Sequence, residues 1–499
     1  MADAKREIER KYESDESGLP DLTGVGGVAA VLDKGLVDLD ATYYDTADER
    51  LAAAALTLRR RTGGSDAGWH LKFPVAPGVR DEIQAPLSDT VPEEIAALVR
   101  SRVRDRALVP LVRLRSARDV RHLVDAEGAL LAEASVDTVT AERLSGTGRV
   151  AQWTEMEVEL ADGGDPALLD QLEKRLRKAG VRPSKSPSKL ARALEQTGGR
   201  KPGSARRAKP VTAGDHLLAY LREQREAILG HDPGVRRDVP DSVHQMRVAT
   251  RRMRSTFRTF GTVLDPAVTG PVAAELKWLA GELGLGRDQE VLAERLIALL
   301  DELPPALVAG PVRERLTAWA SARHGSARGR LVAILDSTRY LALLDTLDAL
   351  LADPPLREAA ARKPEKVLTK AVRKDFAKVS RLVTEALGLP PGQDRDVAVH
   401  EARKKAKRTR YAGEAAVPAL GGPAKSLASS MKSLTSLLGE HQDSVMARRT
   451  LRELSAVAHA AGENGFTYGV LYGREEARAA SVEADLPGLW KEIGTGKPL

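Results

Sequence analysis

The stretch EIERKY, residues 7–12, decides the fold of the first half of the chain. Its charged and apolar residues alternate, and alternate side chains of a β-strand point to opposite faces. Glu7, Glu9 and Lys11 therefore share one face of a strand. The stretch EMEVEL, residues 155–160, places three glutamates on one face in the same way. The inner face of a barrel is ordinarily apolar, so these strands predict a barrel with a charged lumen.

Four further stretches alternate in the same way and carry basic residues on one face. They are LTLRRR (56–61), WHLKF (69–73), GVRDE (78–82) and LVRLR (111–115). Helical patterns near residues 91–103 and 166–179 interrupt the strands. We therefore expect an antiparallel β structure whose outer face is covered by helices. The basic residues on the shared faces are Arg59, Arg61, Lys72, Arg80, Arg113 and Arg115.

A lumen that holds carboxylates and cations together requires a ligand that satisfies both. Close carboxylates repel unless a hard cation lies among them, and Mg²⁺ and Mn²⁺ prefer oxygen ligands. The basic side chains would bind phosphate oxygens that the metal also bridges. The pattern therefore predicts a metal–triphosphate ligand. The alternative is a sheet with paired surface charges. Five of these six stretches each place two or more charged residues on the same face, which disfavours that alternative.

These stretches resemble the CYTH family, named for adenylyl cyclase and thiamine triphosphatase, within the triphosphate tunnel metalloenzymes. EIERK fits the opening ExExK signature, LTLRRR the paired-arginine strand and EMEVEL the closing acidic strand. EASVD supplies the expected acid at Asp137, and SKSPSK resembles the C-terminal lysine region. The resemblance implies an eight-stranded antiparallel tunnel barrel over residues 1–200 that hydrolyses a terminal phosphoryl group.

The resemblance also implies the residues of the site and a Mg²⁺ or Mn²⁺ cofactor. The metal ligands would come from Glu7, Glu9, Asp137, Glu155, Glu157 and Glu159. The triphosphate would be bound by Lys11, Arg59, Arg61, Lys72, Arg80, Arg113, Arg115, Lys185 and Lys189, with Arg118 a further candidate. The catalytic set would be Glu7, Glu9, Lys11, Lys72 and Glu157. Tripolyphosphate is the favoured substrate, and ATP and thiamine triphosphate are the alternatives.

A change of composition separates this half from the rest of the chain. The stretch GGRKPGSARRAKPVTAGD, residues 198–215, is rich in glycine and proline, and we interpret residues 201–212 as a linker. The net charge is −4 over residues 1–200 and +11 over residues 201–499. A basic second half indicates a polyanionic partner.

The second half predicts long helices and contains an internal repeat, over about residues 213–350 and 365–499. HQMRVATRRMR begins at His244 and HEARKKAKRTR at His400, each with basic residues on one helical stripe. LKWLAGELGLGRD and MKSLTSLLGEHQD follow at matching distances. Like charges at these spacings need a compensating anion. The predicted polyphosphate-binding residues are His244, Arg247, Arg251, Arg252, Arg254, Lys277, His400, Arg403, Lys407, Arg408, Arg410 and Lys432.

Other interpretations of the stripes remain: a solvated helix face, cations paired internally with acids on neighbouring helices, and a nucleic-acid surface. Nucleic acid is disfavoured because aromatic residues for base stacking are almost absent from the stripes. The two stripe histidines do not predict a metal site, since the copies share no second ligand at the required spacing.

VHQMRVATRRMR and LGLGRD resemble the two motifs of the CHAD family, a helical domain often fused to CYTH. The resemblance covers residues 213–499 and implies two four-helix bundles about a pseudo-twofold axis, with a basic channel that binds inorganic polyphosphate. The second copy departs from the pattern, because His441-Gln442-Asp443 stands where the first has Gly286-Arg287-Asp288.

The whole chain is thus expected to be an α+β protein that couples an inorganic triphosphatase to a polyphosphate-binding domain. The absence of cysteine, signal peptide and apolar span predicts a cytoplasmic protein, with association to polyphosphate granules a further expectation. Two alternatives are a non-catalytic polyphosphate-binding adaptor and an adenylyl cyclase. The sequence predicts no oligomeric state.

Overall fold

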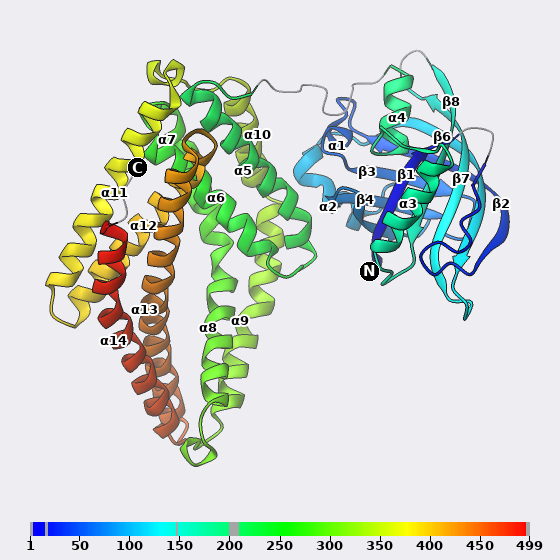
Figure 1. Cartoon of the computed structure of the whole chain (residues 1–499). Helices are drawn as coiled ribbons and strands as arrows, with labels where there is room; N and C mark the ends of the chain where they lie inside the picture. The colour runs from blue at the N-terminus through cyan, green and yellow to red at the C-terminus, as the bar shows by residue number, and fades with distance from the viewer. Residues whose placement is uncertain (1–2, 15–17, 146–147, 199–208, 496–499) are drawn as a thin grey trace. The chain divides into compact units, whose positions relative to one another are not determined.

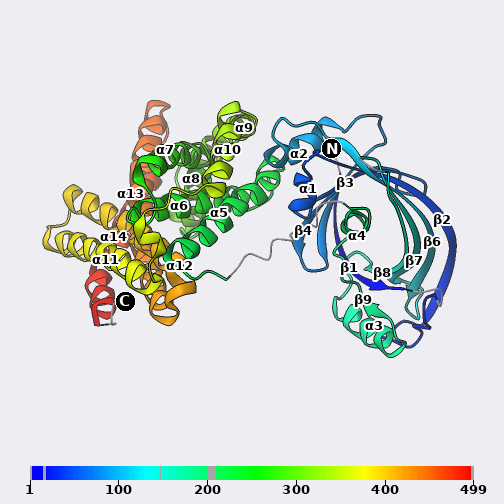
Figure 2. The same cartoon turned by 90° about the horizontal axis from the view of Figure 1, so that it is seen from above.

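The computed structural model describes residues 3–14, 18–145, 148–198 and 209–495 (Figures 1 and 2), without the side chains of residues 285–288, 322–327 and 495. The chain divides into two compact units, Met1–Arg207 and Ala208–Leu499, which we describe separately. Residues 201–208 of the predicted linker lie outside the described part of the chain.

The N-terminal unit is an antiparallel β-barrel, seen along its lumen in Figure 2. The strand order is β5-β4-β3-β2-β6-β7-β8-β1, and β1 also pairs with β5, which closes the ring. The predicted eight-stranded barrel is therefore confirmed. The strands are β1 (Asp3–Glu13), β2 (Ala30–Asp45), β3 (Thr57–Thr62), β4 (Gly68–Ala76), β5 (Val79–Ala85), β6 (Val109–Val124), β7 (Leu130–Arg143) and β8 (Val150–Leu160), and the short β9 (Arg182–Pro183) pairs with β1. The helices are α1 (Arg50–Ala53), α2 (Glu93–Val103), α3 (Ala167–Lys178) and α4 (Lys189–Gln196).

Two helices cover parts of the outer barrel face, as the sequence predicts. Val99 of α2 is buried in one apolar cluster with Trp69 of β4, and Leu172 of α3 in another with Met156 of β8. Burial of such side chains removes apolar area from water and fixes which face of each strand points outward. Because Met156 points outward to α3, the glutamates on either side of it in β8 point into the lumen.

Helix α4 lies inside the ring of strands (Figure 2). Its Leu190 and Leu194 are buried in one cluster with Leu114 of β6 and Ala141 of β7. One end of the lumen is therefore an apolar core around α4. The remainder of the lumen is left for the charged side chains.

The C-terminal unit is helical and contains two related sets of helices. The first comprises α5, α6, α7 with α8, and α9, while the second comprises α11, α12, α13 and α14, and α10 follows the first set. Helices α7 and α8 together occupy the place of the single long helix α13. The helices are α5 (Ala213–Arg236), α6 (Ser242–Thr259), α7 (Pro266–Glu282), α8 (Gly284–Asp301), α9 (Val312–Leu335), α10 (Thr338–Ala352), α11 (Pro364–Gly388), α12 (Gln393–Leu420), α13 (Gly422–Ala460) and α14 (Phe466–Thr495), with the 3₁₀ turns η1 (Pro305–Leu307) and η2 (Glu358–Ala361).

Each set of helices has its own apolar core. One is built around Met253 of α6 and Leu276 of α7, and the other around Met431 and Leu434 of α13. A third cluster joins α8 and α9 to the far ends of α13 and α14, and α6 contacts α12. The predicted all-helical domain is confirmed. Among the described residues, none of the helices combines the length and apolar character needed to cross a membrane.

Candidate functional site

The barrel lumen contains a cavity of about 670 Å³ whose lining is dominated by charge. Among the lining residues that the structure describes, nine are basic and eight are acidic. An ordinary apolar ligand would leave these groups without partners, so the cavity is suited to a charged ligand. The basic residues are Lys5, Lys11, Lys34, Arg59, Arg61, Lys72, Arg80, Arg118 and Lys189, and the acidic ones are Glu7, Glu9, Asp66, Glu82, Glu133, Glu157, Glu159 and Asp162.

Five of the eight acidic side chains lie on three neighbouring strands, β7, β8 and β1. Glu159 of β8 is paired directly opposite Glu9 of β1 on one side and Glu133 of β7 on the other. Carboxylates directly opposite each other across strands destabilise a sheet unless a cation joins them. We call the set Glu7, Glu9, Glu133, Glu157 and Glu159 the acidic wall.

The basic side chains gather on the other part of the ring. Arg59 and Arg61 come from β3, Lys72 from β4, Arg80 from β5 and Arg118 from β6. These strands follow one another around the barrel with β2 between β3 and β6. We call these five residues the basic wall. The register of the barrel thus places most of the carboxylates on one part of the cavity and the arginines on another. Lys5 and Lys11 of β1 lie within the acidic wall, and Glu82 of β5 lies beside the basic wall.

Ion pairs link the cations of β4 and β5 to carboxylates of β1 and β5, strands that follow one another around the barrel. Lys72 Nζ contacts Glu7 and lies 3.4 Å from Glu82, and Arg80 lies 3.7 Å from Glu9. Burial raises the pKa of Glu7 to about 7, because the opposing effect of Lys72 is smaller and Glu82 adds to the shift. The cations present therefore compensate Glu7 incompletely, and a further cation nearby would stabilise its charged form.

Lys189 occupies a second, more deeply buried carboxylate cluster. Ser188 caps α4 by accepting a hydrogen bond from the Ala191 backbone N–H at 3.1 Å, which fixes Lys189 as the first residue of the helix. Lys189 Nζ then binds three carboxylates, Asp137 at 3.0 Å, Glu155 at 2.9 Å and Glu157 at 2.6 Å.

The ion pairs of this cluster determine the direction in which the pKa values of Lys189 and Glu157 shift. Burial would lower the pKa of Lys189, but Asp137, Glu157 and Glu155 outweigh that effect and raise it. Burial would likewise raise the pKa of Glu157, but Lys11, Lys189 and Arg118 hold it well below its ordinary value. The ammonium group of Lys189 thus supplies a fixed positive charge to this end of the site.

The structure corrects several residues of the predicted site. Arg113 and Arg115 do not line the cavity, because inward-facing Arg118 and Val120 have the opposite parity on β6. Arg113 instead pairs with Asp40 on the outer face, with its Nε at 2.9 Å. Lys185 is exposed outside the cavity. Asp137 and Glu155 are also not on the cavity surface.

Three residues that the predicted set omitted belong to the site. Glu82 is 2% exposed and accepts from His70 Nδ1 at 2.9 Å, beside Lys72 and Arg59. Lys5 and Glu133 also line the cavity. Lys5 could have been predicted from the sequence, because it lies on the same face of the strand as Glu7, Glu9 and Lys11.

The remaining acidic residues fit a hard divalent cation. Glu7, Glu9, Glu157 and Glu159 all line the cavity and supply only oxygen donors, as Mg²⁺ and Mn²⁺ require. The raised pKa of Glu7 and the direct opposition of Glu9 and Glu159 are the features that such an ion would relieve. These four residues of the predicted metal set are therefore the ones we retain.

In the helical unit the two basic stripes come together where α6 contacts α12. Several stripe residues are paired with acids. Arg252 of α6 and Arg410 of α12 both contact Glu414, at 2.9 and 2.8 Å, and Arg408 contacts Asp375 at 3.0 Å. For these three arginines the interpretation as internally paired cations is correct.

Other stripe residues crowd against one another. Burial lowers the pKa of Lys407 to about 8, and Arg403, Arg251 and Arg247 add to the shift while Asp443 opposes it. Cations from both helices thus act on one lysine. A bound polyanion would relieve this repulsion.

Buried guanidinium groups of the stripes also indicate a bound polyanion. Burial lowers the pKa of Arg254, and Arg258 and Arg251 add to the effect. The Nε atoms of Arg254 and Arg403 are buried and have no hydrogen-bond partner within the described part of the chain. An anion with several oxygens would supply such partners.

The pseudo-symmetry extends to two glycines that support stripe arginines. A Cβ atom on Gly284 would lie 2.6 Å from Arg247 Nη2, and one on Gly439 would lie 3.3 Å from Arg403 Nη2. In each copy, glycine therefore lets a guanidinium lie against the backbone of the neighbouring helix.

The other predicted residues of the stripes are more peripheral. His244, Lys277 and Lys432 are exposed on α6, α7 and α13. His400 is half-buried, and its Nδ1 contacts Gln442 of the second motif. The side chains of Arg287 and Asp288 lie outside the described residues.

A closed barrel with a charged lumen, followed by a duplicated basic helical domain, defines the CYTH–CHAD class of proteins. The CYTH domain model matches residues 5–194 and the CHAD domain model matches residues 219–452. The chain belongs to these two families, which confirms the resemblance seen in the sequence. CYTH domains are metal-dependent and act on phosphate chains.

Relatives and solved structures resemble the chain to different extents. "Uncharacterized protein MT2285" of Mycobacterium tuberculosis (strain CDC 1551 / Oshkosh) is 39% identical over 98% of this chain and 96% of its own length. PptA from Streptomyces chartreusis is 23% identical, with a TM-score of 0.48 over 56% of this chain and 100% of its own. The CHAD domain from the plant Ricinus communis is 24% identical, with a TM-score of 0.41 over 57% of this chain and 89% of its own.

Proposed function

We propose that the N-terminal domain hydrolyses the terminal phosphoanhydride bond of inorganic tripolyphosphate with Mg²⁺ or Mn²⁺. The observation that carries this proposal is the sorting of charge in the lumen, with an acidic wall and a basic wall around one cavity. Carboxylates suit the metal ion and guanidinium groups suit the phosphate oxygens. A metal–triphosphate complex satisfies both walls.

Residues of the two walls would have different roles in the hydrolysis. Arg59, Arg61 and Lys72 would bind and orient the phosphate oxygens and stabilise the negative charge of the transition state. The bound metal ion would neutralise the triphosphate charge, held by the retained carboxylates of the acidic wall. A second metal ion, or a glutamate of the acidic wall, would position and deprotonate the attacking water.

The lining favours tripolyphosphate over a nucleotide or thiamine triphosphate. Tyr43 and His122 are the aromatic rings among the described lining residues, and Tyr43 lies within hydrogen-bond distance of Arg59, at 3.4 Å. Stacking of a base needs a free aromatic face. A bare phosphate chain has no base or ring and does not need an aromatic face to bind.

The helical domain is proposed to bind inorganic polyphosphate. Support comes from the crowded cations where α6 meets α12 and from the buried Nε atoms of Arg254 and Arg403. Together the domains would form a cytoplasmic protein that holds long polyphosphate and cleaves short chains.

A substrate panel tests the proposed activity. Purified protein with Mg²⁺ or Mn²⁺ should release phosphate from tripolyphosphate faster than from ATP or thiamine triphosphate, and chelation should stop the reaction. Glu157→Gln should lower kcat/KM at least about 100-fold, whereas the exposed Glu127→Gln should retain activity. Binding without turnover would support the adaptor instead, and cyclic nucleotide formed from ATP would support a cyclase.

A separate binding measurement tests the helical domain. Polyphosphate affinity should fall with rising salt, and Arg403→Gln with Lys407→Gln should lower it at least about tenfold. Lys404→Gln is the matched control, because Lys404 is exposed on the same helix and pairs with Glu401 at 2.6 Å. Unchanged affinity in the double variant would reject the assigned surface.

A further inference from the structure

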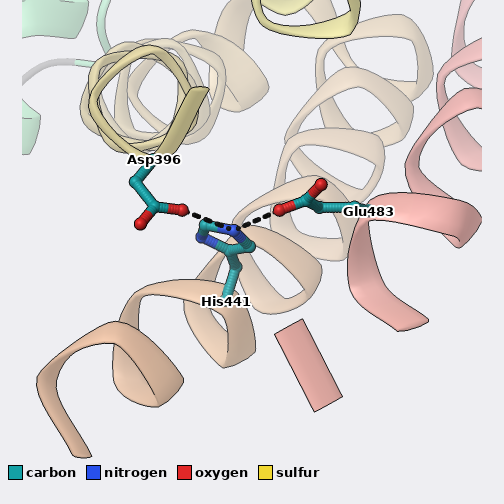
Figure 3. Close-up of side chains that lie close together, drawn as sticks. All are labelled: Asp396, His441 and Glu483. Atoms are coloured by element: carbon teal, nitrogen blue, oxygen red, sulfur yellow. Dashed lines mark hydrogen bonds and ion pairs between the residues drawn. The ribbon is translucent and has the colours of Figure 1, made fainter. Parts of the chain in front are cut away.

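Three potential metal ligands meet in the second helical repeat, next to the start of the α12 stripe (Figure 3). His441 of α13 lies between Asp396 of α12 and Glu483 of α14. Its Nε2 is 3.1 Å from Glu483 Oε1 and 3.3 Å from Asp396 Oδ1, and the three ligand atoms lie within 4.8 Å of one another. The histidine side chain is 1% exposed, so its orientation is fixed by packing.

The spacing matches what a small tetrahedral ion requires. Zinc binds imidazole nitrogen and carboxylate oxygen at about 2.0–2.2 Å, which places ligand atoms of a tetrahedron about 3.3 Å apart. Both measured nitrogen–oxygen distances agree with that separation. A donor set with one imidazole and two carboxylates favours a zinc-like transition metal over Mg²⁺, which prefers oxygen alone.

Two arginines bind the outer oxygens of the same carboxylates. Arg395 Nη1 is 3.2 Å from Glu483 Oε2, and Arg448 Nη2 is 3.7 Å from Asp396 Oδ2. Such outer contacts hold a ligating carboxylate in place and direct its other oxygen inward.

The site belongs to one copy of the repeat. His441 stands where the first copy has Gly286, so the first copy has no equivalent ligand. The basic stripes do not use this histidine, and polyphosphate binding gives no reason for a buried imidazole between two carboxylates.

We propose that Asp396, His441 and Glu483 form a binding site for Zn²⁺ that ties α12, α13 and α14 together. Three protein ligands leave one tetrahedral position for water. The bound ion would stabilise the second helical bundle, because it binds the folded arrangement of three helices and not the unfolded chain. This proposal does not depend on the triphosphatase activity.

Zinc titration of the metal-depleted full-length protein tests the site. We expect a Zn²⁺ equivalent that the tunnel variant Glu157→Gln retains and that Glu483→Gln and His441→Asn each weaken at least about tenfold. Glu453→Gln is the control, because Glu453 pairs with Arg449 on the exposed face of α13 and should bind zinc like the wild type. Co²⁺ in place of Zn²⁺ should give a tetrahedral absorption spectrum that the two ligand variants lose.

The results separate this proposal from a closed network of ion pairs. Zinc binding that is unchanged in Glu483→Gln and His441→Asn would overturn it, as would a stoichiometry that falls to zero in Glu157→Gln. Circular dichroism checks that each variant is folded. If the buried His441→Asn does not fold, Glu483→Gln decides the question, since glutamine keeps the size of the side chain.

Discussion

Replacement of Lys189 by methionine removes the cation that three buried carboxylates share. The side chain is 10% exposed, and its partners Asp137 and Glu155 are nearly inaccessible to water. Removal of one partner from a buried ion pair costs about 3–5 kcal/mol, because the other charge is left uncompensated. In a domain of about 200 residues, 1 kcal/mol changes the melting temperature by about 2–4 °C, so we expect a fall of about 6–20 °C.

Calorimetry of the metal-free protein measures this effect. Lys185→Met is the matched control, because Lys185 is an exposed lysine in the segment just before α4 and its loss should change the melting temperature little. Mn²⁺ should then stabilise Lys189→Met more than the wild type, since a divalent ion can compensate the carboxylates left behind. A fall of less than about 2 °C, equal to that of Lys185→Met, would refute the role of Lys189 as a buried counter-ion.

Three further predictions address the two anion sites. Arg59→Gln should lower kcat/KM for tripolyphosphate about 100-fold or more in steady-state assays, while Arg115→Gln, on the outer barrel face, should not; equal losses would contradict the basic wall. Polyphosphate affinity should weaken as the pH rises through 8, where Lys407 loses its proton, and Lys407→Arg should flatten this titration; an unchanged pH profile would contradict it. Gly284→Ala should weaken polyphosphate binding several-fold, because its Cβ displaces a stripe guanidinium, whereas Gly281→Ala, which meets open space, should bind normally in the same titration.

The fold and one wall of the site could be predicted from strand parity alone. Glu7, Glu9 and Lys11 alternate with apolar residues, and alternation fixes which side chains share a face. The glutamates of β8 follow the same rule, and the structure places Glu157 and Glu159 in the lumen beside them. The alternation of residues was sufficient to predict which side chains face the lumen wherever the other face of the strand is clearly apolar.

Strand β6 shows where parity fails. It carries basic residues on both faces, so Arg113 and Arg115 look as suitable as Arg118 in the sequence. The register between β6 and β7 decides which of these arginines faces the lumen, because it sets Arg118 directly opposite Asp137. Register depends on contacts between strands distant in the chain, which a single sequence does not specify.

Helix α4 shows a second limit of the sequence. Lys185 and Lys189 occur in one short motif and differ little in local pattern. Their difference comes from the Ser188 cap and from Leu190 and Leu194, which place the helix inside the ring and turn Lys189 toward the carboxylates. Such tertiary packing also separates the retained metal ligands from Asp137.

A crystal structure with Mn²⁺ and tripolyphosphate tests the central claim most directly. Anomalous scattering should place manganese beside Glu7, Glu9 and Glu157, with the phosphate oxygens against Arg59 and Lys72 on the opposite part of the cavity. Manganese and phosphate that bind outside the barrel lumen, with the two walls still paired to each other, would contradict it.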